Sequence, residues 1–192
     1  MIDINMIDEI VAYNKDFVFK KAYKKHIADK YPKKKLAVLT CMDTRLTALL
    51  MDALGLKNGD AVIIKNAGAL IMTPFDTTMR SLIVAIYELK IEQIMVVGHT
   101  NCGACDMSYD NFHKQMNARG ISETTFNAIE KDGVSLEEWL DGFKDYSASI
   151  NNTVQMICNH PLIPKDITVH GFIIDSTTGA LTKQVKNGDE KM

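Results

Sequence analysis

The chain has 192 residues and a formal net charge of −2, and this length suffices for one domain with a substantial core. The charge balance leaves no basic surface for nucleic acid or anionic lipid, and no apolar run approaches the ~20 residues of a membrane span. The first residues lack the basic and apolar regions of a signal peptide, and four cysteines do not make a disulfide framework. We therefore expect a cytoplasmic protein with free thiols that binds neither nucleic acid nor membrane.

The first segment, residues 1–34, is predicted to be a helical arm. Its apolar side chains fall on one face of that helix: Ile7, Ile10, Val11, Phe17 and Val18. Such a stripe needs a covering surface, either on the same chain or on a partner subunit. We expect the arm to belong to the same domain as residues 35–186, a single α/β domain, and residues 187–192 to form a loose polar tail.

Continuous apolar runs at residues 36–40, 61–64 and 94–97 are typical of strands that are covered on both faces of a parallel sheet. A helix is predicted between the first two strands, at residues 45–54. A second helix is predicted to start at Thr73, which can cap it, with Pro74 in the first helical position and Asp76 reaching back. The apolar face of this helix comprises Met79, Leu82, Ile83, Ile86 and Leu89.

Residues 105–160 are predicted to be largely helical, with glycines such as Gly120, Gly133 and Gly142 breaking the segment into short helices. Trp139 lies one turn into one of these helices and is expected in the core.

A fourth strand is predicted at residues 167–174 and an antiparallel edge strand at residues 180–185. Helices and strands therefore alternate along the chain. This alternation predicts an α/β fold with a mainly parallel sheet of four strands plus an antiparallel edge strand, flanked by helices, with the N-terminal helical arm.

Residue types that bind metals follow two of the predicted strands. Cys41 follows the first strand, whereas His99 follows the third and Cys102 comes three positions later. Ligands in parallel sheets bind beyond the carboxyl ends of the strands, so these side chains are predicted to meet there. Three ligands from Cys and His describe a catalytic zinc site with an open fourth position. Gly68 follows the second strand, and its backbone could lie close to a substrate bound at this site.

Cys102 also forms a Cys-x-x-Cys pattern with Cys105, which before a helix can be a dithiol redox pair. That interpretation leaves Cys41 and His99 without a role, so we rank it below the zinc site. Cys105 and Cys158 are then expected to be small buried residues.

Asp43 and Arg45 stand just past the first strand. A loop there can let the guanidinium group hold the carboxylate through two hydrogen bonds, which would keep Asp43 ionised and aimed at the fourth metal position. The alternatives are a surface ion pair or a helix cap by Asp43.

These residues form motifs that resemble those of the β-class carbonic anhydrases. The Cys-x-Asp-x-Arg and His-x-x-Cys signatures of that family stand here as residues 41–45 and 99–102, and Asn66-Ala67-Gly68 resembles its Asn-Ala-Gly segment. The resemblance covers roughly residues 36–103 well, and the short chain is similar to the compact branch of the family. The chain lacks an obvious counterpart to the Gln, Phe and Tyr that line the pocket of the plant-type branch.

The resemblance implies one zinc ion per chain held by Cys41, His99 and Cys102. It also implies a homodimer or higher homo-oligomer in which N-terminal helices pack across subunits. The implied reaction is the reversible hydration of carbon dioxide to bicarbonate and a proton, by attack of zinc-bound hydroxide, with Asp43 and Arg45 orienting or gating the zinc-bound water. Two alternatives stay open: a carbonyl sulfide or carbon disulfide hydrolase with the same zinc site and, more distantly, a non-catalytic zinc-stabilised binding protein.

Overall fold

The structure is a computed structural model that describes residues 4–186. Its centre is one five-stranded sheet with the strand order β2-β1-β3-β4-β5. The first four strands are parallel, and the last pairs antiparallel with β4 at the edge. The strands are β1 (Leu36–Cys41), β2 (Ala61–Asn66), β3 (Gln93–His99), β4 (Thr168–Ile174) and β5 (Leu181–Lys186). This architecture confirms the predicted fold class.

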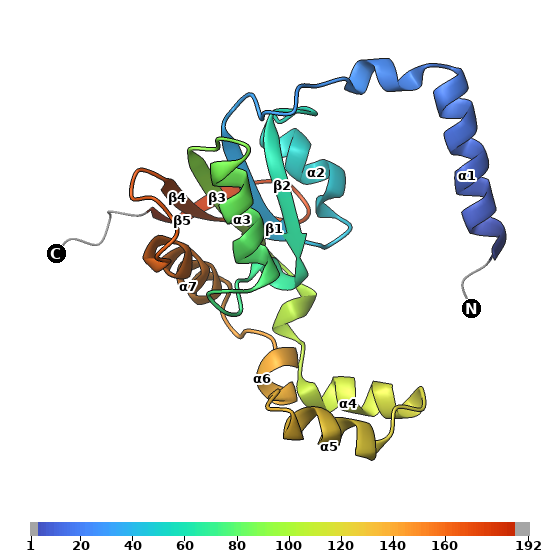
Figure 1. Cartoon of the computed structure of the whole chain (residues 1–192), viewed down its shortest axis with the longest axis vertical. Coiled ribbons are helices and arrows are strands. Elements are labelled where there is room, and N and C mark those ends of the chain that lie inside the picture. Colours follow the sequence, from blue (N-terminus) through green and yellow to red (C-terminus); the bar gives the residue numbers. More distant parts are fainter. Residues whose placement is uncertain (1–3, 187–192) are drawn as a thin grey trace.

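Helices cover both faces of the sheet. Alternate residues of its central strands point to opposite sides, and apolar residues on both sides have to be buried. On one face, Leu39 of β1 packs in a core cluster with α3 (Thr77–Tyr87) and α7 (Tyr146–Asn159). On the other face, Val38 packs in a second cluster with α2 (Leu46–Ala53). Figure 1 shows α3 and α2 on opposite sides of the sheet. This coverage explains the continuous apolar runs of the central strands.

The predicted start of the second helix at Thr73 is wrong, because α3 begins at Thr77 and its cap is Asp76. The two carboxylate oxygens of Asp76 accept hydrogen bonds from the backbone N–H groups of Met79 at 2.7 Å and Met72 at 2.9 Å. An ionised carboxylate is a stronger acceptor than the neutral Thr73 hydroxyl, so the cap falls three residues later. Pro74 lies in the turn that precedes the helix.

A helical lobe projects from the sheet between β3 and α7 (Figure 1). It comprises the 3₁₀ turn η3 (Gly103–Cys105), α4 (Tyr109–Ala118), α5 (Glu123–Lys131) and α6 (Leu136–Leu140). The predicted helical segment is thus confirmed, but the core position of Trp139 is wrong: 62% of this residue is exposed, against 4% of Leu136. Because α6 has only five residues, it buries one narrow face, and Leu136 occupies it.

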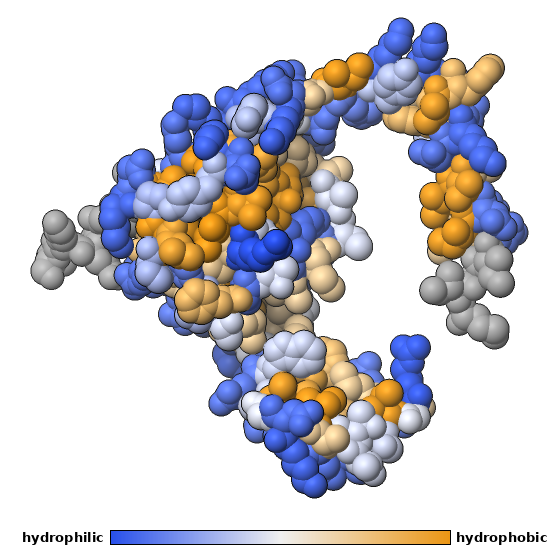
Figure 2. All heavy atoms as spheres, in the orientation of Figure 1, coloured by the Kyte–Doolittle hydropathy of each residue, from blue (hydrophilic) through white to orange (hydrophobic). Residues whose placement is uncertain are grey.

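The N-terminal arm consists of α1 (Ile4–Phe19) and the 3₁₀ turn η1 (Ala22–His26). It therefore ends as a helix before residue 34, and Lys33 and Lys34 donate backbone hydrogen bonds to the turn that precedes β2. Figures 1 and 2 show α1 standing away from the sheet with apolar atoms on its surface. Ile10 is 58% exposed, so the described part of the chain does not cover the predicted stripe.

The predicted loose tail, residues 187–192, lies outside the described residues. Among residues 4–186, no helix combines the length and the apolar character that crossing a bilayer requires.

Candidate metal centre

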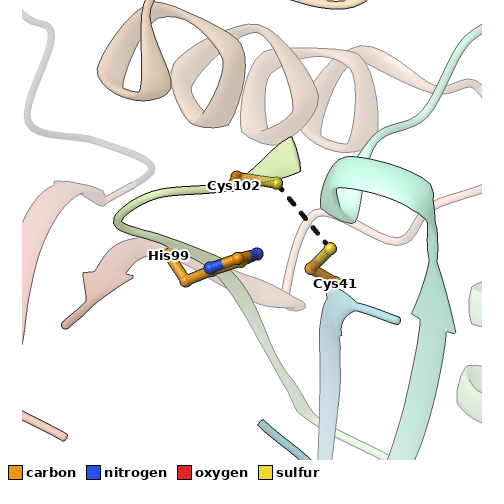
Figure 3. Close-up of side chains that lie close together, drawn as sticks. All are labelled: Cys41, His99 and Cys102. Atoms are coloured by element: carbon orange, nitrogen blue, oxygen red, sulfur yellow. Dashed lines mark hydrogen bonds between the residues drawn. The ribbon is translucent and has the colours of Figure 1, made fainter. Parts of the chain in front are cut away.

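The structure brings Cys41, His99 and Cys102 together at the carboxyl end of the sheet (Figure 3). Cys41 is the last residue of β1 and His99 the last of β3, and these strands are neighbours. Cys102 follows in the loop after β3. The ligand atoms of the three side chains lie within 4.8 Å of one another, and each residue is at least 95% buried. A buried group of two sulfurs and one imidazole is a donor set that zinc prefers.

The distances fit a tetrahedral zinc ion. Zn–S bonds of about 2.3 Å place two sulfur ligands about 3.8 Å apart along a tetrahedral edge, and the Sγ atoms of Cys41 and Cys102 are 3.8 Å apart. The Nε2 atom of His99 is buried without a hydrogen-bond partner, whereas its Nδ1 lies 2.9 Å from the carbonyl oxygen of Thr100. That carbonyl can only accept, so Nδ1 carries the proton and Nε2 presents its lone pair to a metal.

The protonation of the two cysteines also fits a divalent cation. Their mutual hydrogen bond stabilises one thiolate, so it lowers the pKa of Cys41, and it keeps the proton on the other sulfur, so it raises the pKa of Cys102. A second thiolate at this distance would be repelled by the first. A dication between the sulfurs removes this repulsion and stabilises both thiolates. Burial has the largest single effect on the pKa of His99 and lowers it, but the neighbouring Cys41, the carbonyl of Thr100 and the carboxylate of Asp43 together raise that pKa above its usual value.

Asp43 stands beside these ligand atoms and is held by Arg45. The Nε and Nη2 atoms of Arg45 donate to the two carboxylate oxygens at 3.0 and 2.7 Å, and Nη2 also donates to the carbonyl oxygen of Asn101 at 2.8 Å. The hydrogen bonds from Arg45 hold the pKa of Asp43 well below its usual range. The nearer carboxylate oxygen is 3.9 Å from Nε2 of His99. Arg45 thus ties a carboxylate that is ionised at neutral pH to the loop that carries Cys102.

A cavity of about 290 Å³ opens beside the ligands. Gly68 lines it with a φ of +82°, a conformation in which glycine is favoured because it has no Cβ atom. A Cβ atom added there would also approach the ring of Phe143 to 3.1 Å. The full lining is Cys41, Met42, Asp43, Ala67, Gly68, Cys102, Gly103, Ala104 and Met107. The structure therefore places every residue that we selected from the sequence in or beside one small space.

Cys105 lies outside the metal-binding group and forms a hydrogen bond that raises the pKa of Tyr146. Sequence analysis missed Ala104, Met107 and Phe143 as parts of the site. These are apolar residues in a segment with a helical pattern, so their types carried no signal of a binding role.

The fold and the site define a class: an α/β protein with a buried Cys-His-Cys metal-binding group at the carboxyl end of a parallel sheet. A sequence model of the carbonic anhydrase family matches residues 36–181, and the chain belongs to this family.

Three relatives illustrate the range of similar proteins. A Bacillus subtilis protein with a provisional carbonic anhydrase name, YvdA, is 45% identical over 91% of this chain and 89% of its own length. The crystal structure of β-carbonic anhydrase isoform I from Trichomonas vaginalis is 36% identical, with a TM-score of 0.84 over 93% of this chain and 97% of that one. A carbon disulfide hydrolase from Acidithiobacillus thiooxidans is 32% identical over 77% of this chain and 76% of its own.

Proposed function

We propose that the protein catalyses the reversible hydration of carbon dioxide to bicarbonate and a proton, with one zinc ion per chain held by Cys41, His99 and Cys102. The observation that carries this proposal is the clustering of three buried ligand atoms within 4.8 Å of one another, beside a cavity, in a chain of the carbonic anhydrase family. When bound at this site, zinc supplies a Lewis acid that lowers the pKa of water and so provides a nucleophile near neutral pH.

Asp43 and Arg45 have separate tasks in this proposal. The Asp43 carboxylate accepts a hydrogen bond from the water that is to react and thereby orients it toward carbon dioxide. Arg45 keeps the carboxylate ionised and away from the metal, because its two side-chain hydrogen bonds occupy both oxygens. Asp43 is then a hydrogen-bond acceptor for the reaction, and Arg45 is its positioning residue.

Gly68 contributes to substrate binding through its backbone. It lines the cavity together with Cys102 and Gly103, and the absence of a side chain lets a small substrate approach the backbone closely.

A second candidate activity is the hydrolysis of carbon disulfide or carbonyl sulfide. It is favoured by the 32% identity to a carbon disulfide hydrolase. The same ligands and the same Asp43 could serve either reaction, because all three substrates are small, uncharged and attacked at carbon.

We further propose that the protein is a cytoplasmic homodimer or higher homo-oligomer. Its four cysteines are free, as expected in a reducing compartment. The exposed stripe on α1, including Ile7, Ile10 and Val11, is a surface that burial against a second subunit would stabilise.

The activity is tested by stopped-flow measurement of carbon dioxide hydration with zinc-loaded and zinc-stripped protein, beside assays with carbonyl sulfide and carbon disulfide. We expect zinc-dependent hydration of carbon dioxide to have the largest kcat/KM. A larger kcat/KM for carbon disulfide would favour the second activity, and inactivity toward all three substrates would reject both.

The ligand assignment is tested by elemental analysis of purified variants. Cys41→Ser, His99→Ala and Cys102→Ser should each lose most of the zinc, whereas Cys105→Ser, the matched control three residues from Cys102, should retain it. Equal loss in Cys105→Ser and Cys102→Ser would contradict the assignment.

A further inference from the structure

A second cavity, of about 360 Å³, adjoins the cavity at the metal centre. The two cavities share Ala67, Ala104 and Met107 in their linings. We call the second one the Trp139 cavity. Its remaining apolar wall is formed by Leu70, Met72, Trp139 and Leu140. The shared residues make the two spaces neighbours across a thin wall, in which Met107 has the longest and most flexible side chain.

Most polar side chains of the Trp139 cavity form hydrogen bonds within the protein itself. The side-chain nitrogen of Asn66 donates to the carbonyl oxygen of Leu70 at 2.6 Å and to the hydroxyl of Thr78 at 2.9 Å. Both carboxylate oxygens of Asp76 accept backbone N–H groups, as described for the cap of α3, and Asp141 accepts the N–H of Tyr109 at 2.7 Å. Among the described residues that line the cavity there is no Lys, Arg or His.

These features select the kind of ligand. Both carboxylate oxygens of Asp76 and one of Asp141 are engaged, and the described lining holds no cation. The cavity therefore offers an anion such as bicarbonate no ion pair, whereas it offers an apolar molecule dispersion contacts. Its size is that of a small-molecule site. The cavity at the metal centre differs, because it contains Asp43 and lies beside the guanidinium group of Arg45.

We propose that the Trp139 cavity is a binding subsite for an uncharged, linear triatomic substrate, which passes Met107 to reach the metal centre. The charged product leaves by the polar side, past Asp43 and Arg45. This inference rests on the proposed function for the identity of the substrate, which carbon dioxide, carbonyl sulfide and carbon disulfide satisfy alike. The occupant follows from the wall that an apolar space shares with the reaction site, formed by Ala67, Ala104 and Met107.

Binding is tested with xenon, an apolar probe that occupies apolar cavities in proteins. Crystals of the zinc-loaded protein in its native assembly are pressurised with xenon and its position is read from anomalous scattering. We expect a xenon atom between Leu70, Trp139 and Leu140, and its loss in Met72→Trp or Leu140→Trp. A cavity without xenon, or one filled by a side chain of a neighbouring subunit, would overturn the proposal.

The route is tested by kinetics of the same variants. Filling the cavity should lower kcat/KM for the preferred substrate roughly tenfold, which is the low end of the effect of a one-methylene misfit in an apolar pocket. The kcat and the zinc content should stay unchanged, because the subsite acts before the chemical step. Leu162→Trp is the matched control: it fills a different cavity, lined also by Pro74 and Phe75, that shares Asp76 with the Trp139 cavity but no lining residue with the metal-centre cavity.

Equal kcat/KM values in Met72→Trp, Leu140→Trp and the control, or a fall confined to kcat, would contradict the route. If the wild-type protein turned over none of the three substrates, the proposed function would fail, whereas the xenon experiment would still decide whether the cavity takes small apolar molecules.

Discussion

Gly142 connects the helical lobe to the metal centre, and its replacement by alanine should loosen both. The backbone N–H of Gly142 donates to the carbonyl of Met107 at 3.2 Å, and that of Phe143 donates to the carbonyl of Ala104 at 3.3 Å. A Cβ atom added at Gly142 would lie 1.7 Å from the carbonyl oxygen of Ala104. An ordinary carbon–oxygen contact is about 3.3 Å, so the two segments would have to separate by more than an ångström.

The cost follows from these contacts. Each of the two hydrogen bonds contributes roughly 1 kcal/mol, and overpacking of a tight site costs about 1–3 kcal/mol. We therefore expect Gly142→Ala to lower the free energy of unfolding by about 3 kcal/mol or more. With a urea m-value of about 2 kcal/mol/M, the midpoint should fall by about 1.5 M. The zinc affinity should fall too, because Ala104 is two residues from Cys102.

The assay is urea unfolding of the zinc-loaded protein at one protein concentration, followed by circular dichroism, with zinc affinity measured by chelator competition. Gly103→Ala is the matched control, since a Cβ atom added at Gly103 meets nothing within 4 Å. If Gly142→Ala and Gly103→Ala unfolded at the same urea concentration, the close approach at Ala104 would not constrain the fold and the reasoning would be refuted.

Further predictions concern the Asp43–Arg45 pair, the pH dependence and the arm. Arg45→Ala should free Asp43 to bind zinc, so the activity should fall at nearly unchanged zinc content. Arg45→Lys should restore only part of the activity, because an ammonium group cannot make the two-point contact. Wild-type activity of Arg45→Ala from about pH 6 to 9 would contradict this expectation. The same variant should raise the pKa of Asp43 toward the ordinary carboxyl value in a carboxyl NMR titration, because Arg45 lowers it in the wild type. The stability from this ion pair is present above the ordinary carboxyl pKa and is lost only as pH falls through the lowered one. Two thiolate ligands reduce the net positive charge at zinc, so zinc would lower the pKa of water less than it does with neutral ligands. We therefore expect kcat/KM to rise through the alkaline side of neutrality, and a profile that falls there would exclude this assignment. Deletion of residues 1–30 should give a monomer or an aggregate by light scattering, and an active, well-behaved dimer would show that the arm is not needed for assembly.

The sequence alone was sufficient for the fold class and for the residues that meet at the metal centre. Each central strand is a short apolar run bounded by polar residues, because both of its faces are buried, and that pattern is local. Cys41 and His99 each end such a run, and parallel neighbours bring their carboxyl ends to one edge of the sheet. The residue types then restrict the chemistry, since two thiols and an imidazole suit zinc.

Other features depended on contacts between segments that are distant in the sequence. Trp139 follows a core pattern, yet it is exposed because α6 is too short to bury more than one face. Gly142 is suited to ending a helix, but its close approach to Ala104 exists only once the two segments pair. The two adjoining cavities likewise depend on where α6 and the loop after β3 come to rest. Periodicity and capping act over a few residues, so they can be recognised in the sequence. The space between packed elements depends on the relative position of whole segments, and only the tertiary structure decides that position.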